Sequence, residues 1–317
     1  MFEQWQKSNE LPSLIVNDFT CFTGSMLATD YGIPLVSLFP GVYLRLFEAL
    51  YKPAGMSSGI APLHSIFEKI YYWFQGHSIL FTLFPMINEF EQARMQYHDN
   101  NSGKFQPLNL KANVQIIGQS RALDFNYLAP PSVFYVGSFL RASLVDEIST
   151  QSLPSDYEAF LQSSKPIIYC AFGTIVKMKA SLVKTLTDAF NTLYQYNIIW
   201  VVSESKQTMY MKQKLNSTHV RLVNYAPQQR LLADSRVKLF FTHCGGNSVA
   251  EAVYFAKPVL GMPFFADQPA LAARLVYRNV ALQLDKDGVT SKQVVQAIVE
   301  LTTNPLYVDN MKSLSVI

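Results

Sequence analysis

One segment in the second half of the chain carries residue types that could bind an anion. The apolar run 237–241 is followed by THCGGNS, residues 242–248, and then by a helical pattern. A buried strand that turns through two glycines into a helix directs free backbone N–H groups, and the positive end of the helix dipole, at whatever lies above the turn. We expect a phosphate group at this position.

His243 and the first residues of the expected helix each have two interpretations. An isolated histidine at a strand end is usually structural, but beside a glycine turn and a helix start it favours donation to a phosphate oxygen. Asn247 and Ser248 can cap the helix, and Ser248 with Glu251 has the spacing of a capping box. The functional alternative is that Ser248 binds phosphate while Glu251 accepts hydrogen bonds from a ribose diol. The local pattern leaves both open.

Three other strand ends carry residues that could reach the same sheet edge. Asp267 and Gln268 either begin a helix or hydrogen-bond to sugar hydroxyls, which carboxylate and amide groups match well. Gly173 permits close backbone approach, and the Thr174 hydroxyl could then meet a phosphate. Tyr225 is either a packing residue or a surface on which a base stacks.

The elements that must position these residues are short apolar runs alternating with longer helical patterns. The runs are apolar throughout, which is typical of parallel strands buried on both faces. The alternation predicts doubly wound parallel sheets. Thr290 and Gln293 form a capping box for one helix. Strands are expected at residues 14–16, 34–39, 114–118, 133–137, 166–172, 197–202, 220–225, 237–243 and 258–262, and helices at 182–194, 248–255, 269–277 and 291–302.

The composition of the chain changes at residues 141–165, which are polar and rich in turn-forming residues. We therefore expect one domain at residues 1–148 and a second at 149–317. The first domain offers only three or four strands, because residues 43–106 read as helices and loops rich in aromatic residues and methionine. Since a βαβ unit takes about 30 residues, this domain is expected to be incomplete at its N-terminus.

Composition excludes several classes of protein. The 317 residues are 49% hydrophobic, enough for two domains with sizeable cores. A net charge of +3 without a basic run gives no reason to expect a nucleic acid or an anionic membrane. The scattered Cys21, Cys170 and Cys244 argue against a disulfide scaffold or a zinc ribbon. The N-terminus is no signal peptide and the longest apolar stretch, 79–87, is too short to span a bilayer, so the chain as given is expected to be soluble.

Three segments together resemble the donor signature of the UDP-glycosyltransferases. They are YAPQQRLL at 225–232, FFTHCGGNSVAEAV at 240–253 and PVLGMPFFADQP at 258–269, and both order and spacing fit. The similarity covers the whole chain, most strongly residues 165–275. It implies the GT-B fold, with two Rossmann-like doubly wound parallel-sheet domains. It also implies a hexosyltransferase that moves a sugar from a UDP-sugar, a co-substrate, to a small lipophilic acceptor such as a sterol, lipid or phenol. Inversion is implied, without a metal or another cofactor.

The resemblance also implies a role for each matching residue. It places uracil on Tyr225 and against the Ala226 backbone, and the ribose on Gln228 and Glu251. It implies that His243 and the helix dipole offset the negative charge that develops on the departing UDP. The sugar would be held by Asp267 and Gln268, and the diphosphate by Thr174, His243, Gly245, Gly246, Asn247 and Ser248.

In this family a histidine oriented by an aspartate is the general base, and the segment LIVNDF resembles the place of that aspartate. Asp18 is therefore the catalytic candidate. The family histidine lies upstream, but no histidine precedes Asp18 here, and His64, His77 and His98 do not match the pattern. The chain also stops before the final helix and the membrane anchor of many members. It is expected to be truncated at both ends.

Two other functions stay open. One is a catalytically inactive, truncated donor-binding protein that lacks the base histidine. The other is a different GT-B enzyme, such as a nucleotide-sugar epimerase, which the NS…E and DQ pattern disfavours. The sequence names neither the sugar nor the acceptor, and it leaves the oligomeric state and the cellular location open.

Overall fold

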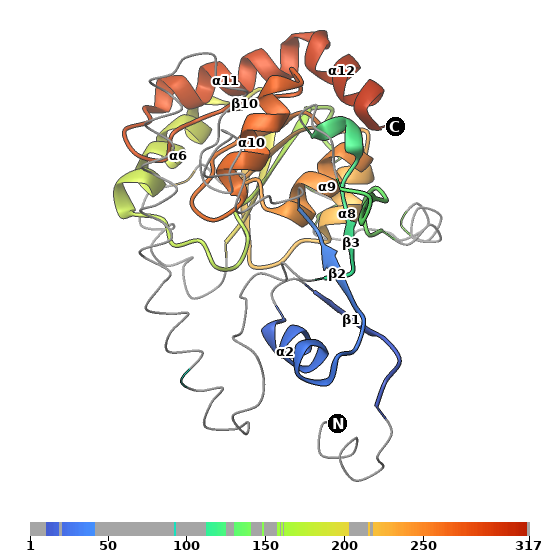
Figure 1. Cartoon of the computed structure of the whole chain (residues 1–317). Coiled ribbons are helices and arrows are strands. Elements are labelled where there is room, and N and C mark those ends of the chain that lie inside the picture. The colour runs from blue at the N-terminus through green and yellow to red at the C-terminus, as the bar shows by residue number, and fades with distance from the viewer. Residues whose placement is uncertain are drawn as a thin grey trace, which may run out of the picture.

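The computed structural model describes residues 11–18, 21–41, 92, 112–124, 130–140, 148, 157–158, 160, 162–202, 215 and 218–315. Within these ranges the chain forms two parallel sheets with helices around them (Figure 1). Sheet A has the strand order β1-β2-β3-β4, and sheet B has the order β10-β9-β8-β5-β6-β7. Every neighbouring pair is parallel, so the predicted fold class is confirmed.

Sheet A contains the four strands expected in the first half of the chain. Helix α2 (Phe22–Tyr31), which the sequence did not predict, packs beside β1 and ends at Gly32, whose φ of +64° gives a left-handed cap. The residues predicted to be rich in helices and loops, 43–106, lie outside the described residues apart from residue 92. The strands are β1 (Ile15–Asp18), β2 (Leu35–Phe39), β3 (Val114–Ile117) and β4 (Val133–Tyr135).

Sheet B contains the five strands expected in the second half and one more, β10, which is too short to give a clear pattern. Its strands are β5 (Ile167–Ala171), β6 (Asn197–Val201), β7 (Val220–Val223), β8 (Val237–Thr242), β9 (Val259–Gly261) and β10 (Ala281–Gln283). The helices that follow them are α6 (Ala180–Thr192), α8 (Gln228–Ala233), α9 (Gly246–Tyr254), α10 (Gln268–Tyr277), α11 (Ser291–Thr303) and α12 (Pro305–Ser315).

The helices cover both faces of sheet B, which explains why its central strands are apolar throughout. Helices α6 and α11 pack on one face, while α8, α9, α10 and α12 pack on the other. Every residue of β5 is buried, and alternate side chains point into the two cores. Burial of apolar surface on this scale is the main force that stabilises the sheet and fixes the loops at its edge. The predicted capping box of Thr290 and Gln293 is confirmed at the start of α11.

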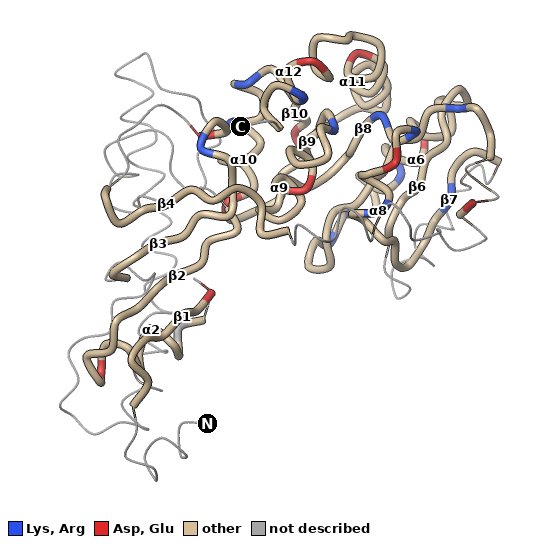
Figure 2. Tube along the Cα trace, turned by 90° about the vertical axis from the view of Figure 1, so that its right-hand side faces the viewer, with Lys and Arg blue, Asp and Glu red and all other residues tan. Residues whose placement is uncertain are grey.

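Side chains from the carboxyl end of sheet A hold the helices of sheet B. Gln119, just after β3, donates from Nε2 to the backbone oxygen of Gly246 at 2.8 Å. Ser138 donates to the backbone oxygen of Ala250 at 2.8 Å. Figure 2 shows sheet A lying alongside α9 and α10, consistent with these contacts. The start of α9 is therefore fixed by both sheets.

A buried ion pair makes a second connection between the two sheets. Asp124 follows the short 3₁₀ helix η2 (Arg121–Leu123), and its Oδ1 lies 2.7 Å from Nε of Arg274 on α10. The side chains of Asp124 and Arg274 are 0% and 1% exposed. Tyr135 of β4 donates its hydroxyl to the other carboxylate oxygen. Sheet A is thus joined to α10 as well as to α9.

Strands β1 to β4 precede the predicted domain boundary at 148/149, and β5 to β10 follow it. Most of the predicted linker, residues 141–165, lies outside the described residues, so the boundary stays a prediction. Within the described ranges, no helix has the length and apolar character needed to cross a membrane.

Candidate functional site

A cavity of about 830 Å³ opens at the carboxyl edge of sheet B, where the loops after β5, β7 and β8 meet. Its size suits a ligand larger than a monosaccharide. The cavity gathers all but one of the residues predicted to bind the donor, since only Asp267 is missing from its lining. These lining residues are Thr174, Tyr225, Ala226, Gln228, His243, Gly245, Gly246, Asn247, Ser248, Glu251 and Gln268.

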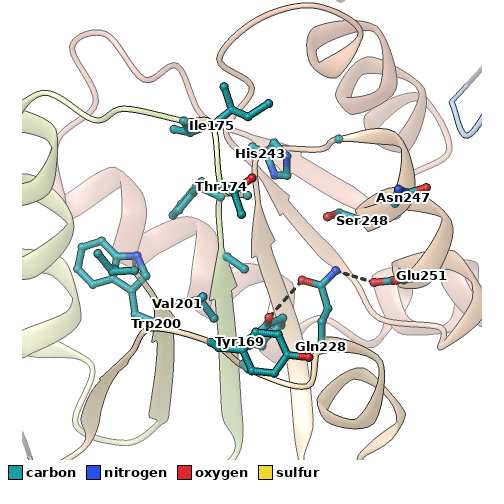
Figure 3. A pocket seen from close by; sticks show the side chains of 18 of the residues that line it. Tyr169, Thr174, Ile175, Trp200, Val201, Gln228, His243, Asn247, Ser248 and Glu251 are labelled. Carbon is teal, nitrogen blue, oxygen red and sulfur yellow. Dashed lines mark hydrogen bonds between the residues drawn. The ribbon is translucent and has the colours of Figure 1, made fainter. Parts of the chain in front are cut away.

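The predicted strand, glycine turn and helix are present at the centre of the cavity. Strand β8 ends at Thr242, Gly245 is the N-cap of α9, and Cys244 between them has a φ of +63°. A Cβ atom on Gly173 or Gly245 would stand 2.9 or 2.7 Å from Nε2 of His243. Glycine at both positions therefore leaves room for the imidazole between the loops that follow β5 and β8 (Figure 3).

The electrostatics of this turn favour an anion. Burial lowers the pKa of His243 to about 4, although a backbone hydrogen bond at Ala171 acts in the opposite direction. The imidazole is therefore neutral at pH 7. Helix α9 has no acidic residue in its first turn, and no side chain caps it. Its first N–H groups and the positive end of its dipole are therefore available to a phosphate above the turn.

The capping box predicted for Ser248 and Glu251 is wrong. Helix α9 begins at Gly246, three residues earlier than this box requires, so Ser248 lies inside the first turn. The Glu251 carboxylate instead accepts hydrogen bonds from Nε2 of Gln228 at 2.5 Å and Nε2 of Gln229 at 2.9 Å. Glu251 therefore faces the cavity, as Figure 3 shows, and it does not cap α9.

The loop after β7 carries a separate group of predicted residues. Tyr225 is 74% exposed, and its backbone oxygen accepts a hydrogen bond from the Tyr157 hydroxyl at 2.5 Å. Ala226 is buried beside it, and Gln228 begins α8. The Tyr169 hydroxyl donates to Oε1 of Gln228 at 3.1 Å. An exposed aromatic ring on an anchored backbone is a geometry on which a flat base can stack.

Asp267 and Gln268 are placed differently from each other. Gln268 lines the cavity, and its Oε1 accepts hydrogen bonds from the backbone N–H groups of Phe264 and Phe265 at 2.8 and 3.2 Å. Asp267 occupies the N-cap position of α10, as one interpretation expected, but its side chain makes no capping bond. It lies against Gly41 in the loop after β2, and burial raises its pKa. The predicted contact of both residues with a sugar stays a prediction.

Asp18, the predicted catalytic residue, is the exposed last residue of β1 and is not part of the cavity lining. His64, His77 and His98 lie outside the described residues. Of the described histidines, His243 lines the cavity, and Nε2 of His219 lies 2.9 Å from the backbone oxygen of Phe190. The catalytic role of Asp18 therefore stays a prediction.

In the described part of the chain, no group of three or more histidine, cysteine, aspartate or glutamate residues is arranged to hold a metal ion. The absence of a cofactor remains an expectation from the resemblance.

The sequence patterns missed Tyr169 and Gln229, which make the hydrogen-bond network around Gln228 and Glu251. A signal for Tyr169 was present, because a tyrosine inside the buried run IIYCA needs a partner for its hydroxyl. Gln229 carried no such signal, since a second glutamine at a helix start is common on a protein surface.

Comparisons with known proteins identify what this arrangement is similar to. A family model described as UDP-glucoronosyl and UDP-glucosyl transferase matches residues 72–317. UDP-glucuronosyltransferase 2B23 of Macaca fascicularis is 30% identical over 208 residues, which cover 65% of this chain and 37% of that protein. UDP-glucuronosyltransferase 3A1 of Mus musculus is 29% identical over 324 residues, which cover 97% and 58%. The chain thus spans less than two thirds of the length of either relative.

A solved structure of Os79 from O. sativa in complex with UDP matches with a TM-score of 0.65 and 16% identity. The match covers 99% of this chain and 74% of that one. Together with the two parallel sheets, this likeness confirms the predicted GT-B fold.

Proposed function

The chain belongs to the UDP-glucuronosyl and UDP-glucosyl transferase family, and from this premise we propose that it transfers a hexosyl group from a UDP-sugar to a hydroxyl group of a small lipophilic acceptor. The observation that carries the proposal is one cavity at the edge of sheet B. It brings together His243, the uncapped start of α9 and the hydrogen-bonded pair of Gln228 and Glu251.

The diphosphate of the donor would lie over the start of α9. As the bond between the anomeric carbon and the phosphate oxygen breaks, negative charge grows on the departing UDP. Preorganised N–H groups and the helix dipole stabilise that charge without having to reorganise. His243 lines the same point, and Thr174 and Ser248 add hydroxyl groups that can donate. These groups take the part that a metal ion plays in other transferases, so we propose no metal.

The nucleoside would lie between the loops after β5 and β7. Uracil would stack on the exposed ring of Tyr225, whose backbone Tyr157 anchors. The ribose hydroxyls would donate to Glu251, a carboxylate that accepts but cannot donate. The two mammalian relatives, both named UDP-glucuronosyltransferases, support a UDP-linked donor.

We propose that transfer inverts the anomeric carbon. The acceptor oxygen forms its new bond on the face opposite the phosphate, the bond to the phosphate oxygen breaks, and a base takes the acceptor proton. Asp18 would orient that base in the active protein. We propose that residues 43–106, which are rich in aromatic residues and methionine, line the acceptor pocket; apart from residue 92 they lie outside the described residues.

The test is a transfer assay with the full chain, UDP-glucose or UDP-glucuronic acid, and a phenol or sterol acceptor in the presence of EDTA. Mass spectrometry should find the acceptor carrying one hexosyl group. NMR should find a β-glycoside, because the donor is α-linked. Activity that requires an added metal would contradict the metal-free mechanism, and an α-glycoside would contradict inversion.

A second candidate is a protein that binds UDP-sugars without activating an acceptor. One observation favours it: Asp18 ends β1 in sheet A, whereas His219 and His243, the histidines that the structure describes, both belong to the half of the chain that forms sheet B. Saturable UDP binding without transfer to any acceptor would support this candidate over the enzyme. Formation of an epimerised UDP-sugar without acceptor would contradict both.

A further inference from the structure

Tyr169 begins a chain of hydrogen bonds that crosses the floor of the cavity. It lies on β5, the strand at the centre of sheet B, and is 1% exposed. Its hydroxyl donates to Oε1 of Gln228 at 3.1 Å, and Nε2 of Gln228 donates to Oε2 of Glu251 at 2.5 Å. Figure 3 shows the two bonds in succession, from Tyr169 to Gln228 and from Gln228 to Glu251. Nε2 of Gln229 donates to the other oxygen, Oε1, at 2.9 Å.

This series of hydrogen bonds allows only one orientation of the Gln228 amide. Burial raises the pKa of Tyr169, so its phenol stays protonated and can donate. If the amide were rotated by 180°, its oxygen would face a carboxylate oxygen of Glu251, and two acceptors would oppose each other at hydrogen-bond distance. The Glu251 carboxylate, which can only accept, therefore selects the orientation in which the amide N–H points at it, and the hydroxyl of Tyr169 holds the amide there by donating to its oxygen.

The same series of hydrogen bonds fixes the carboxylate of Glu251. Each carboxylate oxygen can accept about two hydrogen bonds, and each already accepts one from a glutamine amide. One acceptor position per oxygen is left for a ligand. Two acceptors held side by side match the two neighbouring hydroxyl donors of a ribose.

We propose that Tyr169 is a positioning residue for ribose recognition, which acts through Gln228 to hold Glu251 against the cis-diol of a ribonucleoside diphosphate. This inference rests on the proposed function, because it requires that the cavity binds UDP. It assigns the preference for a ribonucleotide over a deoxyribonucleotide to a hydrogen-bond chain that starts in the core of the sheet.

The test compares UDP with 2′,3′-dideoxyuridine diphosphate, which lacks the diol, by calorimetric titration of the full chain. Wild type should bind UDP more tightly, and the ratio of the two dissociation constants measures recognition of the diol. Tyr169→Phe keeps the ring and removes only the hydroxyl. It should reduce the ratio by about threefold to tenfold, as expected for one hydrogen bond, with little effect on the dideoxy analogue.

The matched control is Tyr196→Phe. Tyr196 is also buried, at 5% exposure, and its hydroxyl lies 2.6 Å from Oγ1 of Thr302. It belongs to the core on the opposite face of sheet B. A general loss of stability would affect both variants, whereas the ratio should change only in Tyr169→Phe. Thermal unfolding of both variants shows whether they are folded at the temperature of the titration.

A second variant independently tests Gln228, the middle residue of the hydrogen-bond series. Gln228→Ala keeps Tyr169 and should also reduce the ratio, and adding Tyr169→Phe to it should cause no further reduction. A wild-type ratio in Tyr169→Phe, or additive effects in the double variant, would overturn the inference while leaving the proposed function intact. No saturable binding of UDP by wild type would overturn both.

Discussion

Loss of the buried carboxylate of Asp124 should destabilise the chain far more than loss of a surface carboxylate. Asp124 and Arg274 are almost fully buried and 2.7 Å apart. Asp124→Ala would leave the guanidinium in the core without its carboxylate, and the Tyr135 hydroxyl would lose its acceptor as well. Breaking a buried pair from one side costs about 3–5 kcal/mol, because the remaining charge has lost its water and its partner. We therefore expect the free energy of unfolding to fall by about 3–5 kcal/mol.

The sequence offers a matched control for this substitution. Lys184 and Asp188 on α6 form an ion pair at 2.6 Å, but their side chains are 65% and 48% exposed. Exposed pairs contribute only about 0.2–1 kcal/mol. Asp188→Ala should therefore lower the free energy of unfolding by less than about 1 kcal/mol. The two substitutions remove the same type of contact and differ mainly in burial.

Urea unfolding followed by circular dichroism measures both effects, with the slope of the transition checked because two sheets can unfold separately. The double variant Asp124→Ala, Arg274→Met removes both charges, so its loss should be smaller than the sum of the single losses. A loss below about 1 kcal/mol for Asp124→Ala, or equal losses for Asp124→Ala and Asp188→Ala, would show that burial does not strengthen the Asp124–Arg274 pair.

Three further predictions concern the cavity. Glu251→Ala should weaken UDP binding by about 1–3 kcal/mol in a calorimetric titration through loss of charge-assisted hydrogen bonds, and unchanged affinity would exclude Glu251 from the ribose site. The pKa of His243 is about 4 in the folded chain and its ordinary value is 6.5, so the unfolded chain binds more protons between these values. Urea unfolding should therefore show wild type losing about 1–3 kcal/mol more stability than His243→Gln as the pH falls from 7 to 4, and equal losses would contradict this. In Gly173→Ala the new Cβ atom would stand 2.9 Å from Nε2 of His243, at a φ of +70°; in Gly288→Ala, at a φ of +88°, it would meet open space. Only Gly173→Ala should therefore weaken UDP binding. Equal UDP affinities of the two variants in the titration would show that the turn at Gly173 tolerates a side chain.

The loops of the cavity could be predicted because each is a local pattern. The residues 242–248 specify a strand end, a glycine turn and a helix start within one short segment, and the structure has all three. What the segment could not specify was the first residue of α9. The Ser248 and Glu251 pair has the spacing of a capping box, but the backbone already turns into the helix at Gly245, so spacing alone gave the wrong boundary.

The contacts that join the two sheets could not be predicted for a different reason. Gln119 reaches Gly246 across 127 residues, and Arg274 reaches Asp124 across 150. No pattern within a helix or strand predicts such a partner, because the partner depends on how the two sheets pack. Helix α12 and strand β10 were missed because the first has a mostly polar surface and the second has three residues.

The proposed function requires that the cavity at the edge of sheet B binds uridine diphosphate. Calorimetric titration of the purified chain with UDP tests it most directly. We expect saturable binding of one UDP per chain, weakened by about 1–3 kcal/mol in Glu251→Ala. Heat that shows no saturation, or binding that Glu251→Ala leaves unchanged, would contradict this proposal.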